Sequence, residues 1–160
     1  MIIENVKIKN YKSIRDLDLS FGRINIMIGG NGVGKSNLIS FFKLLNQISS
    51  KNLLSTVIKN GGADNLLYFG RKVSPSIDAT IAFRQDPSQL SYYRISLEPT
   101  TEDTFYFAQE AVGWSTDLEK IHWKTLGKGG HSESLFYTEK QYFAGIVSWV
   151  GGDLGRFKVY

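Results

Sequence analysis

A motif of eight residues, from Gly29 to Ser36, carries the residue types that bind phosphate. It reads Gly-Gly-Asn-Gly-Val-Gly-Lys-Ser and fits the pattern G-x-x-x-x-G-K-[ST] without a mismatch. Glycines let several backbone N–H groups converge on one anion, because side chains would block a close approach and some positions need a positive φ. The motif therefore predicts a cradle for a polyphosphate.

Each residue of the motif has an expected contact. Lys35 is expected to reach the β- and γ-phosphates as a flexible point charge. Ser36 is the expected metal ligand, because Mg²⁺ prefers oxygen donors such as its hydroxyl. Asn37 is either a polar residue supporting the cradle or simply part of the first helical turn. The remaining expected loop contacts are Asn31, Gly32, Val33 and Gly34.

The flanking sequence predicts the elements that position this loop. Residues 24–28 (INIMI) are apolar apart from Asn25 and predict a buried strand. After the motif, apolar residues recur at helical spacing up to Ser49, which predicts a helix whose positive N-terminal end faces the anion. Its apolar stripe consists of Leu38, Phe41, Phe42, Leu45 and Ile48, widened by Ile39 and Leu44.

Two stretches of alternating polarity precede the cradle. They run from Ile2 to Ile8 and from Leu17 to Phe21, with a polar break at residues 11–15 between them, and both predict amphipathic strands. Many phosphate-cradle enzymes instead place the cradle strand first.

This order resembles the start of the ABC-type P-loop ATPases of the SMC, RecF and OLD-nuclease group (AAA family ATPases). Tyr11-Lys12-Ser13-Ile14 matches the group's short element before the cradle, and residues 28–37 closely match its Walker A loop. The resemblance is specific over residues 1–50. It implies an α/β P-loop NTPase fold and an ABC-ATPase-like nucleotide lobe that binds ATP and Mg²⁺.

The resemblance further implies that Lys12 lies beside the nucleotide; an exposed turn lysine is the alternative. In the full-length protein it implies ATP-gated homodimerisation and a role on or with DNA in repair, recombination or phage defence.

The rest of the chain is expected to complete one lobe over residues 1–160, divided into a Walker A core (1–60), a β-meander subdomain (61–115) and a mixed part (116–160). Asn52 is placed to cap a short helix that ends at Gly61-Gly62, and residues 59–76 are expected to form a connection. The resemblance identifies the meander with the group's antiparallel β-subdomain, although spacing alone fits any meander. Its strands are expected at Ile77–Phe83, Ser91–Leu97 and Thr104–Ala108, followed by a helix at 139–150 and a strand at 156–160.

Composition narrows the class of protein. The chain has 160 residues, is 42% hydrophobic and contains no cysteine, which excludes disulfides and thiolate metal sites. No apolar run approaches the roughly 20 residues of a membrane span, and the N-terminus does not resemble a signal peptide, so a cytoplasmic protein without a membrane partner is expected. Residues 1–60 hold nine Lys and Arg against three Asp and Glu. This excess of positive charge suits the binding of a polyanion such as nucleotide or DNA. For DNA, a lysine-rich face that contacts only solvent explains the excess equally well.

Two motifs that hydrolysis requires in this group are missing. No apolar strand ends in Asp-Glu, and the LSGGQ signature is absent. The nearest substitutes are TFYFAQE, which ends at Glu110, and GIVSWVGGD, which ends at Asp153. We therefore expect an incomplete N-terminal portion of a longer ATPase that binds ATP without turning it over; a complete small P-loop protein is the alternative. A nucleoside or other small-molecule kinase, a GTPase and a non-hydrolysing nucleotide-binding module are the competing functions. Against a kinase, the chain has neither a P-loop close to its N-terminus nor an Arg-rich lid. Against a GTPase, it lacks the guanine-reading motif N-K-x-D.

Overall fold

An antiparallel sheet forms the frame of the part of the chain that the structure describes. The computed structural model describes residues 2–30, 32–86, 89–115 and 120–136. In this part of the chain the elements follow in the order β1 (Ile2–Tyr11), β2 (Ile14–Ser20), α1 (Lys35–Ser49), α2 (Leu53–Lys59), β3 (Ile77–Asp86), β4 (Gln89–Pro99), β5 (Phe105–Ser115) and β6 (His122–Thr125). The sheet has six strands in the order β2-β1-β3-β4-β5-β6.

The strands predicted before and after the cradle belong to one sheet, because β1 pairs antiparallel with β3, from Ile2 opposite Arg84 to Lys9 opposite Asp78. Strands β3, β4 and β5 therefore continue the sheet that β1 and β2 begin. Both predicted N-terminal strands, the short helix after Asn52 and the three later strands are confirmed, and β5 extends further than expected. The helix expected at 139–150 and the strand at 156–160 lie outside the described residues.

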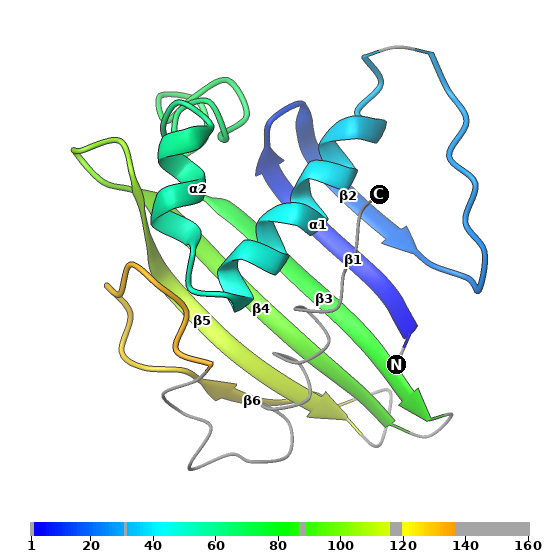
Figure 1. Ribbon diagram of the computed structural model, residues 1–160. Helices are drawn as coiled ribbons and strands as arrows, with labels where there is room; N and C mark the ends of the chain where they lie inside the picture. The colour runs from blue at the N-terminus through cyan, green and yellow to red at the C-terminus, as the bar shows by residue number, and fades with distance from the viewer. Residues whose placement is uncertain (1, 31, 87–88, 116–119, 137–160) are drawn as a thin grey trace.

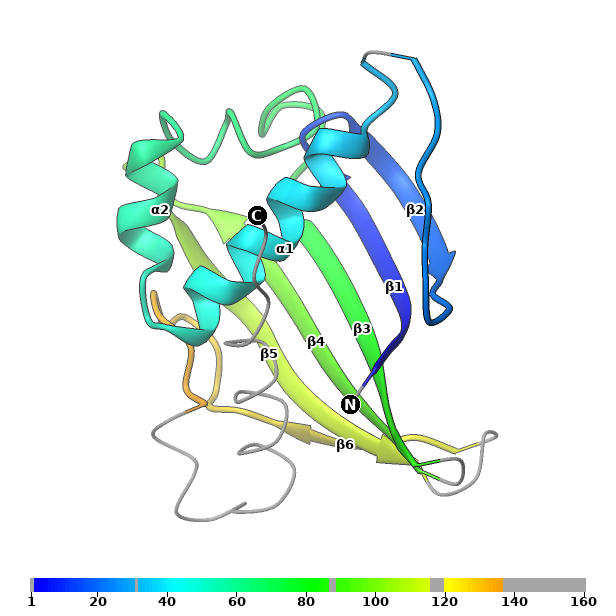
Figure 2. The same cartoon turned by 45° about the vertical axis from the view of Figure 1, so that its right-hand side comes forward.

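Helices α1 and α2 both lie on one face of the sheet (Figures 1 and 2). Alternation in the strands explains why: β1 turns Val6 and Ile8 toward the helices and Lys7 and Lys9 away from them. The core between helix layer and sheet is built from large apolar side chains of both, including Phe41, Leu45, Ile48, Ile81, Ile95 and Phe107. This packing fixes α1, and with it the end of the helix that follows the glycine-rich loop.

The strand predicted at residues 24–28 is wrong. These residues form no ladder with the described strands, and Ile24, Ile26 and Ile28 are 85%, 80% and 91% exposed. A tight turn directs the segment away from the sheet: the Asn25 side chain accepts a hydrogen bond from Gly22 N and donates one to Gly22 O, each at 2.9 Å. Figure 1 shows the segment as part of a long loop between β2 and α1. An extended segment becomes a strand only when a neighbour supplies ladder hydrogen bonds, and none of the described strands does so.

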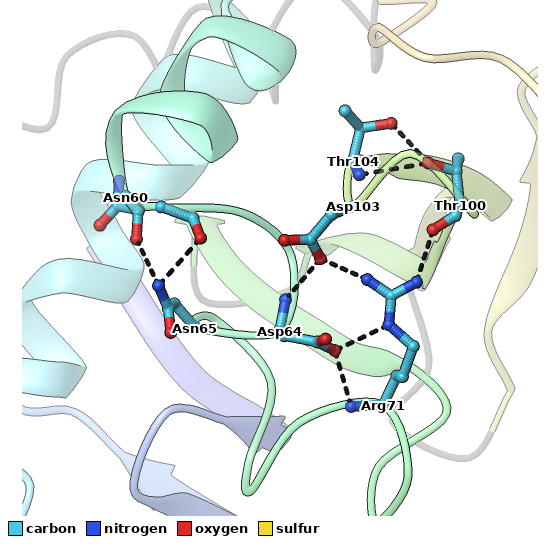
Figure 3. Close-up of polar contacts among 8 residues, drawn as sticks. Asn60, Asp64, Asn65, Arg71, Thr100, Asp103 and Thr104 are labelled. Carbon is cyan, nitrogen blue, oxygen red and sulfur yellow. Dashed lines mark hydrogen bonds and ion pairs between the residues drawn. The ribbon is translucent and has the colours of Figure 1, made fainter.

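The connection from α2 to β3 is held against the hairpin between β4 and β5 by one arginine (Figure 3). Arg71 Nε donates to Asp64 Oδ1 at 2.8 Å, Nη1 donates to Thr100 O at 2.7 Å, and Nη2 forms a short contact with Asp103. Asp103 Oδ1 also accepts from Asp64 N at 3.1 Å. The sequence predicted a connection at residues 59–76, and the contacts of Arg71 show how this connection is held in place.

Candidate nucleotide-binding site

The glycine-rich loop closes around the side chain of Lys35. Lys35 Nζ donates to Gly29 O at 2.5 Å and to Gly30 O at 2.6 Å. The loop thus folds back over the start of α1 and brings its backbone within hydrogen-bond distance of the ammonium group. These two carbonyl oxygens hold the ammonium group of Lys35 at the loop, where it supplies a positive charge.

Two glycines of the loop have conformations that other residues rarely adopt. Gly32 has φ 87° and Gly34 has φ 97°. Gly34 also stands next to Ser13, because a Cβ at residue 34 would lie 3.4 Å from Ser13 Oγ. The sequence motif requires glycine at residue 34, and the positive φ of this residue supplies the reason.

The N-terminus of α1 suits an anion. Gly34 occupies the cap position, no side chain caps the helix, and the first turn contains no acidic residue. Such a helix end keeps its partial positive charge available, and a negatively charged group there is stabilised by N–H groups and the helix dipole. Ser36 is exposed in this first turn, so its hydroxyl is accessible to a metal ion bound with the phosphates.

The turn between β1 and β2 packs against the same end of α1. Asn37 Nδ2 donates to Ser13 Oγ at 2.7 Å, and Lys12 Nζ donates to Ser40 Oγ at 2.9 Å. The Tyr11 hydroxyl lies 2.8 Å from the same Ser40 oxygen. Burial raises the pKa of Tyr11 to about 12 and lowers the pKa of Lys12. Lys12 is therefore held beside α1, one turn beyond the loop.

The structure brings together most of the residues that the sequence singled out. Lys35, Ser36 and Asn37 lie in the first turn of α1, directly after Gly32, Val33 and Gly34, and Lys12 contacts Ser40 one turn further along the helix; Asn31 lies outside the described residues. Sequence reasoning did not assign Tyr11 or Ser40 to this site. Their signal was weak, because one hydroxyl in a helix and one aromatic at a strand end have many ordinary explanations.

Glu110 does not belong to this site. Its carboxylate is fully buried on the helix side of β5 and accepts hydrogen bonds from Tyr93 Oη at 2.8 Å, Ser134 Oγ at 2.6 Å and Leu135 N at 3.0 Å. His131 Nε2 lies 2.9 Å from Glu110 Oε2, the oxygen that also accepts from Leu135 N. These contacts fasten residues 126–136 to the core, so Glu110 has a structural role. Asp153 lies outside the described residues.

The glycine-rich loop at the start of α1 and the similarity to known proteins together define a class, the ATPase domains with a P-loop NTPase-like fold. Within that class, the chain belongs to the AAA ATPase domain family, whose model matches residues 1–129. Over 46 residues the chain is 41% identical to the DNA replication and repair protein RecF of Bacillus cytotoxicus. That match covers 28% of this chain and 12% of the length of RecF.

A solved structure supports the fold independently of sequence. It comes from work entitled "Structural biochemistry of ATP-driven dimerization and DNA stimulated activation of SMC ATPases". The similarity covers 100% of this chain and 87% of that one, with a TM-score of 0.50 and 14% sequence identity. At this identity the match concerns the fold alone. The family assignment therefore rests on the AAA ATPase domain model.

Proposed function

We propose that this chain binds Mg²⁺–ATP in the loop of residues 29–36 as the nucleotide lobe of an SMC/RecF-like ATPase. The observation that carries the proposal is the closure of the glycine-rich loop around Lys35 at the uncapped N-terminus of α1. Lys35 exchanges its carbonyl partners for phosphate oxygens, and the backbone N–H groups of the helix start bind the same anion. Ser36 contributes its hydroxyl to the metal ion, which neutralises phosphate charge when bound.

Calorimetric titration of Mg²⁺–ATP tests this proposal. A charge-assisted contact is worth about 1.5–3 kcal/mol, so Lys35→Ala should weaken binding by roughly ten- to a hundredfold. Lys43→Ala is the matched control, because Lys43 is an exposed lysine further along the same helix. Equal affinity of Lys35→Ala and the parent would contradict the proposal. GTP in place of ATP tests the GTPase alternative, which predicts tighter GTP binding.

We further propose that the 160-residue chain binds ATP without turning it over. Hydrolysis needs a group that orients the attacking water. In the part of the chain that the structure describes, the first turn of α1 carries no carboxylate, and Glu110 is engaged in the core. Phosphate release by the parent should therefore be no faster than by Lys35→Ala. Lys35-dependent turnover on the order of 1 s⁻¹, which ordinary enzymes reach, would refute this.

The exposed apolar segment at residues 24–28 supports assembly as part of the function. Three isoleucines at 80% exposure or more are unfavourable in water, and burying a side chain of this type contributes about 1.5–3 kcal/mol. We propose that this segment is covered in the working ATPase and that nucleotide binding promotes its dimerisation. Sedimentation of the full-length protein with and without ATP tests this, and a monomer under both conditions would contradict it.

DNA is the macromolecular partner that we propose for the full-length protein. The basic excess of residues 1–60 supports it, as does the 46-residue similarity to a DNA replication and repair protein. Binding that rests on phosphate contacts falls steeply with salt. Fluorescence anisotropy with duplex DNA at low and moderate salt is the test, and an absence of binding at low salt would refute the role of this lobe.

A further inference from the structure

The face of the sheet opposite the helices contains a groove of about 370 Å³. Its charged and polar lining consists of Lys7, Lys9, Asp78, Thr80, Arg94 and Gln109, contributed by β1, β3, β4 and β5. Strand pairing explains how they meet. Lys7 is opposite Thr80 and Thr80 is opposite Arg94, so these three side chains form one row across the sheet.

Arg94 lies at one end of this row and stacks on an aromatic ring. Its guanidinium carbon lies 3.8 Å from the centre of the Trp123 ring, and Tyr92 packs against the same tryptophan at 5.9 Å between ring centres. Trp123 in turn needs Gly113 beneath it, since a Cβ there would lie 2.9 Å from the indole. Among the described residues no carboxylate forms an ion pair with Arg94. A stacked guanidinium keeps its planar set of donors available, and that geometry matches phosphate and carboxylate.

The two lysines of the groove have only weak competing partners. Lys7 contacts Asp18 at 2.9 Å and Lys9 contacts Asp16 at 3.7 Å, and all four side chains are more than half exposed. Ion pairs of this kind contribute little and exchange readily. The one lining carboxylate, Asp78, is opposite Lys9 in the register and accepts a hydrogen bond from Ser76. An anion is therefore favoured along the row of Lys7, Thr80 and Arg94, away from Asp78.

We propose that this groove is a second anion site, which binds a phosphoryl group between Arg94 and Lys7 with the hydroxyl of Thr80 beside it. Its chemistry is independent of the glycine-rich loop, because the helices lie on the other face of the sheet (Figure 2). Phosphoryl groups reach such a groove either on a small phosphorylated molecule or on a nucleic-acid backbone, and both present the same oxyanion to the guanidinium.

Pyrophosphate is the probe for the site, titrated into the full 160-residue chain carrying Lys35→Ala so that the loop does not dominate the signal. Adding Arg94→Gln to this background should weaken binding about tenfold. Arg15→Gln is the matched control, because it removes the same charge from an exposed position of β2 outside the groove and should leave binding unchanged. Arg94→Lys should recover only part of the affinity, because lysine keeps the charge and loses the planar fork.

The proposal would be overturned if Arg94→Gln left the pyrophosphate affinity unchanged. It would also be overturned if Arg15→Gln weakened pyrophosphate binding as much as Arg94→Gln does. A second titration with a 12-residue oligothymidylate distinguishes the sources. Arg94-dependent binding of the oligonucleotide with a steep salt dependence identifies a nucleic-acid backbone. Arg94-dependent binding of pyrophosphate alone identifies a small phosphorylated molecule. Because all titrations use the Lys35→Ala background, a failure here is separate from a failure of ATP binding at the loop.

Discussion

Asn37 Nδ2 donates a hydrogen bond to Ser13 Oγ at 2.7 Å, which joins the turn between β1 and β2 to the first turn of α1. Asn37→Ala removes this bond, whose net contribution is about 1 kcal/mol. We expect the free energy of unfolding in urea to fall by about that amount and ATP affinity to weaken, because the loop is anchored by the same helical turn. Gln47→Ala, further along α1, is the control. An unchanged ATP affinity in Asn37→Ala would show that the turn plays no part in positioning the loop.

Glu133 caps a helix that is 79 residues away in sequence. Its two carboxylate oxygens accept hydrogen bonds from Leu53 N and Leu54 N, each at 2.9 Å, at the start of α2. Loss of a cap costs about 1 kcal/mol, so Glu133→Ala should lower the free energy of unfolding by that amount. Glu102→Ala, in an exposed turn, should have no measurable effect. Equal stability of these two variants would show that the cap contributes nothing.

Tyr11 makes stability depend on alkaline pH. Its folded pKa is raised to about 12 by burial, above the value of 10.0 for a free phenol. Between these values the unfolded chain releases the proton and the folded chain keeps it, so the stabilisation is complete below pH 10 and is lost as the pH rises through 12. A shift of this size corresponds to about 2–3 kcal/mol.

Urea unfolding of the parent and Tyr11→Phe between pH 9 and 12 measures this effect. The variant should be less stable at pH 9, because it loses the contact with Ser40. Its stability should then fall less steeply with pH than that of the parent. Parallel curves for the two proteins would contradict the proposed role of Tyr11.

Glu110 should be among the most sensitive positions in the core. Glu110→Ala leaves buried donors from Tyr93 and Ser134 without their acceptor, and losses of this kind add to about 3–5 kcal/mol. Glu110→Gln keeps one carbonyl acceptor and should lose less. Denaturant unfolding of both variants is the measurement. A Glu110→Ala protein as stable as Glu110→Gln would show that the buried network is not what fastens residues 126–136.

The local patterns predicted α1, the early strands and the phosphate loop, because each depends on residues close together in sequence. The heptapeptide after Asn52 illustrates the limit. A helix there was predicted with Asn52 as its cap, and α2 does begin at Leu53, yet the Asn52 side chain makes no capping hydrogen bond. Glu133 performs that function instead. A capping residue this far along the chain leaves no local pattern.

Two larger differences between the sequence-based expectations and the structure also arise from contacts between distant parts of the chain. INIMI at residues 24–28 has every local property of a buried strand, but pairing depends on a neighbouring strand that the local sequence does not specify. The contact between Arg94 and Trp123 likewise has no local sequence pattern. Their contact depends on the order β4-β5-β6 and on the small size of Gly113 between them.

Hydrogen–deuterium exchange tests most directly whether Mg²⁺–ATP binds in the loop of residues 29–36, because it reports where on the chain binding occurs. In the parent chain, peptides spanning Gly29 to Leu38 should exchange more slowly when Mg²⁺–ATP is added. The same peptides of Lys35→Ala, at the same ATP concentration, should show little or no protection, whereas those of Lys43→Ala should be protected as in the parent. Absence of protection in the parent, or equal protection in Lys35→Ala, would contradict the account.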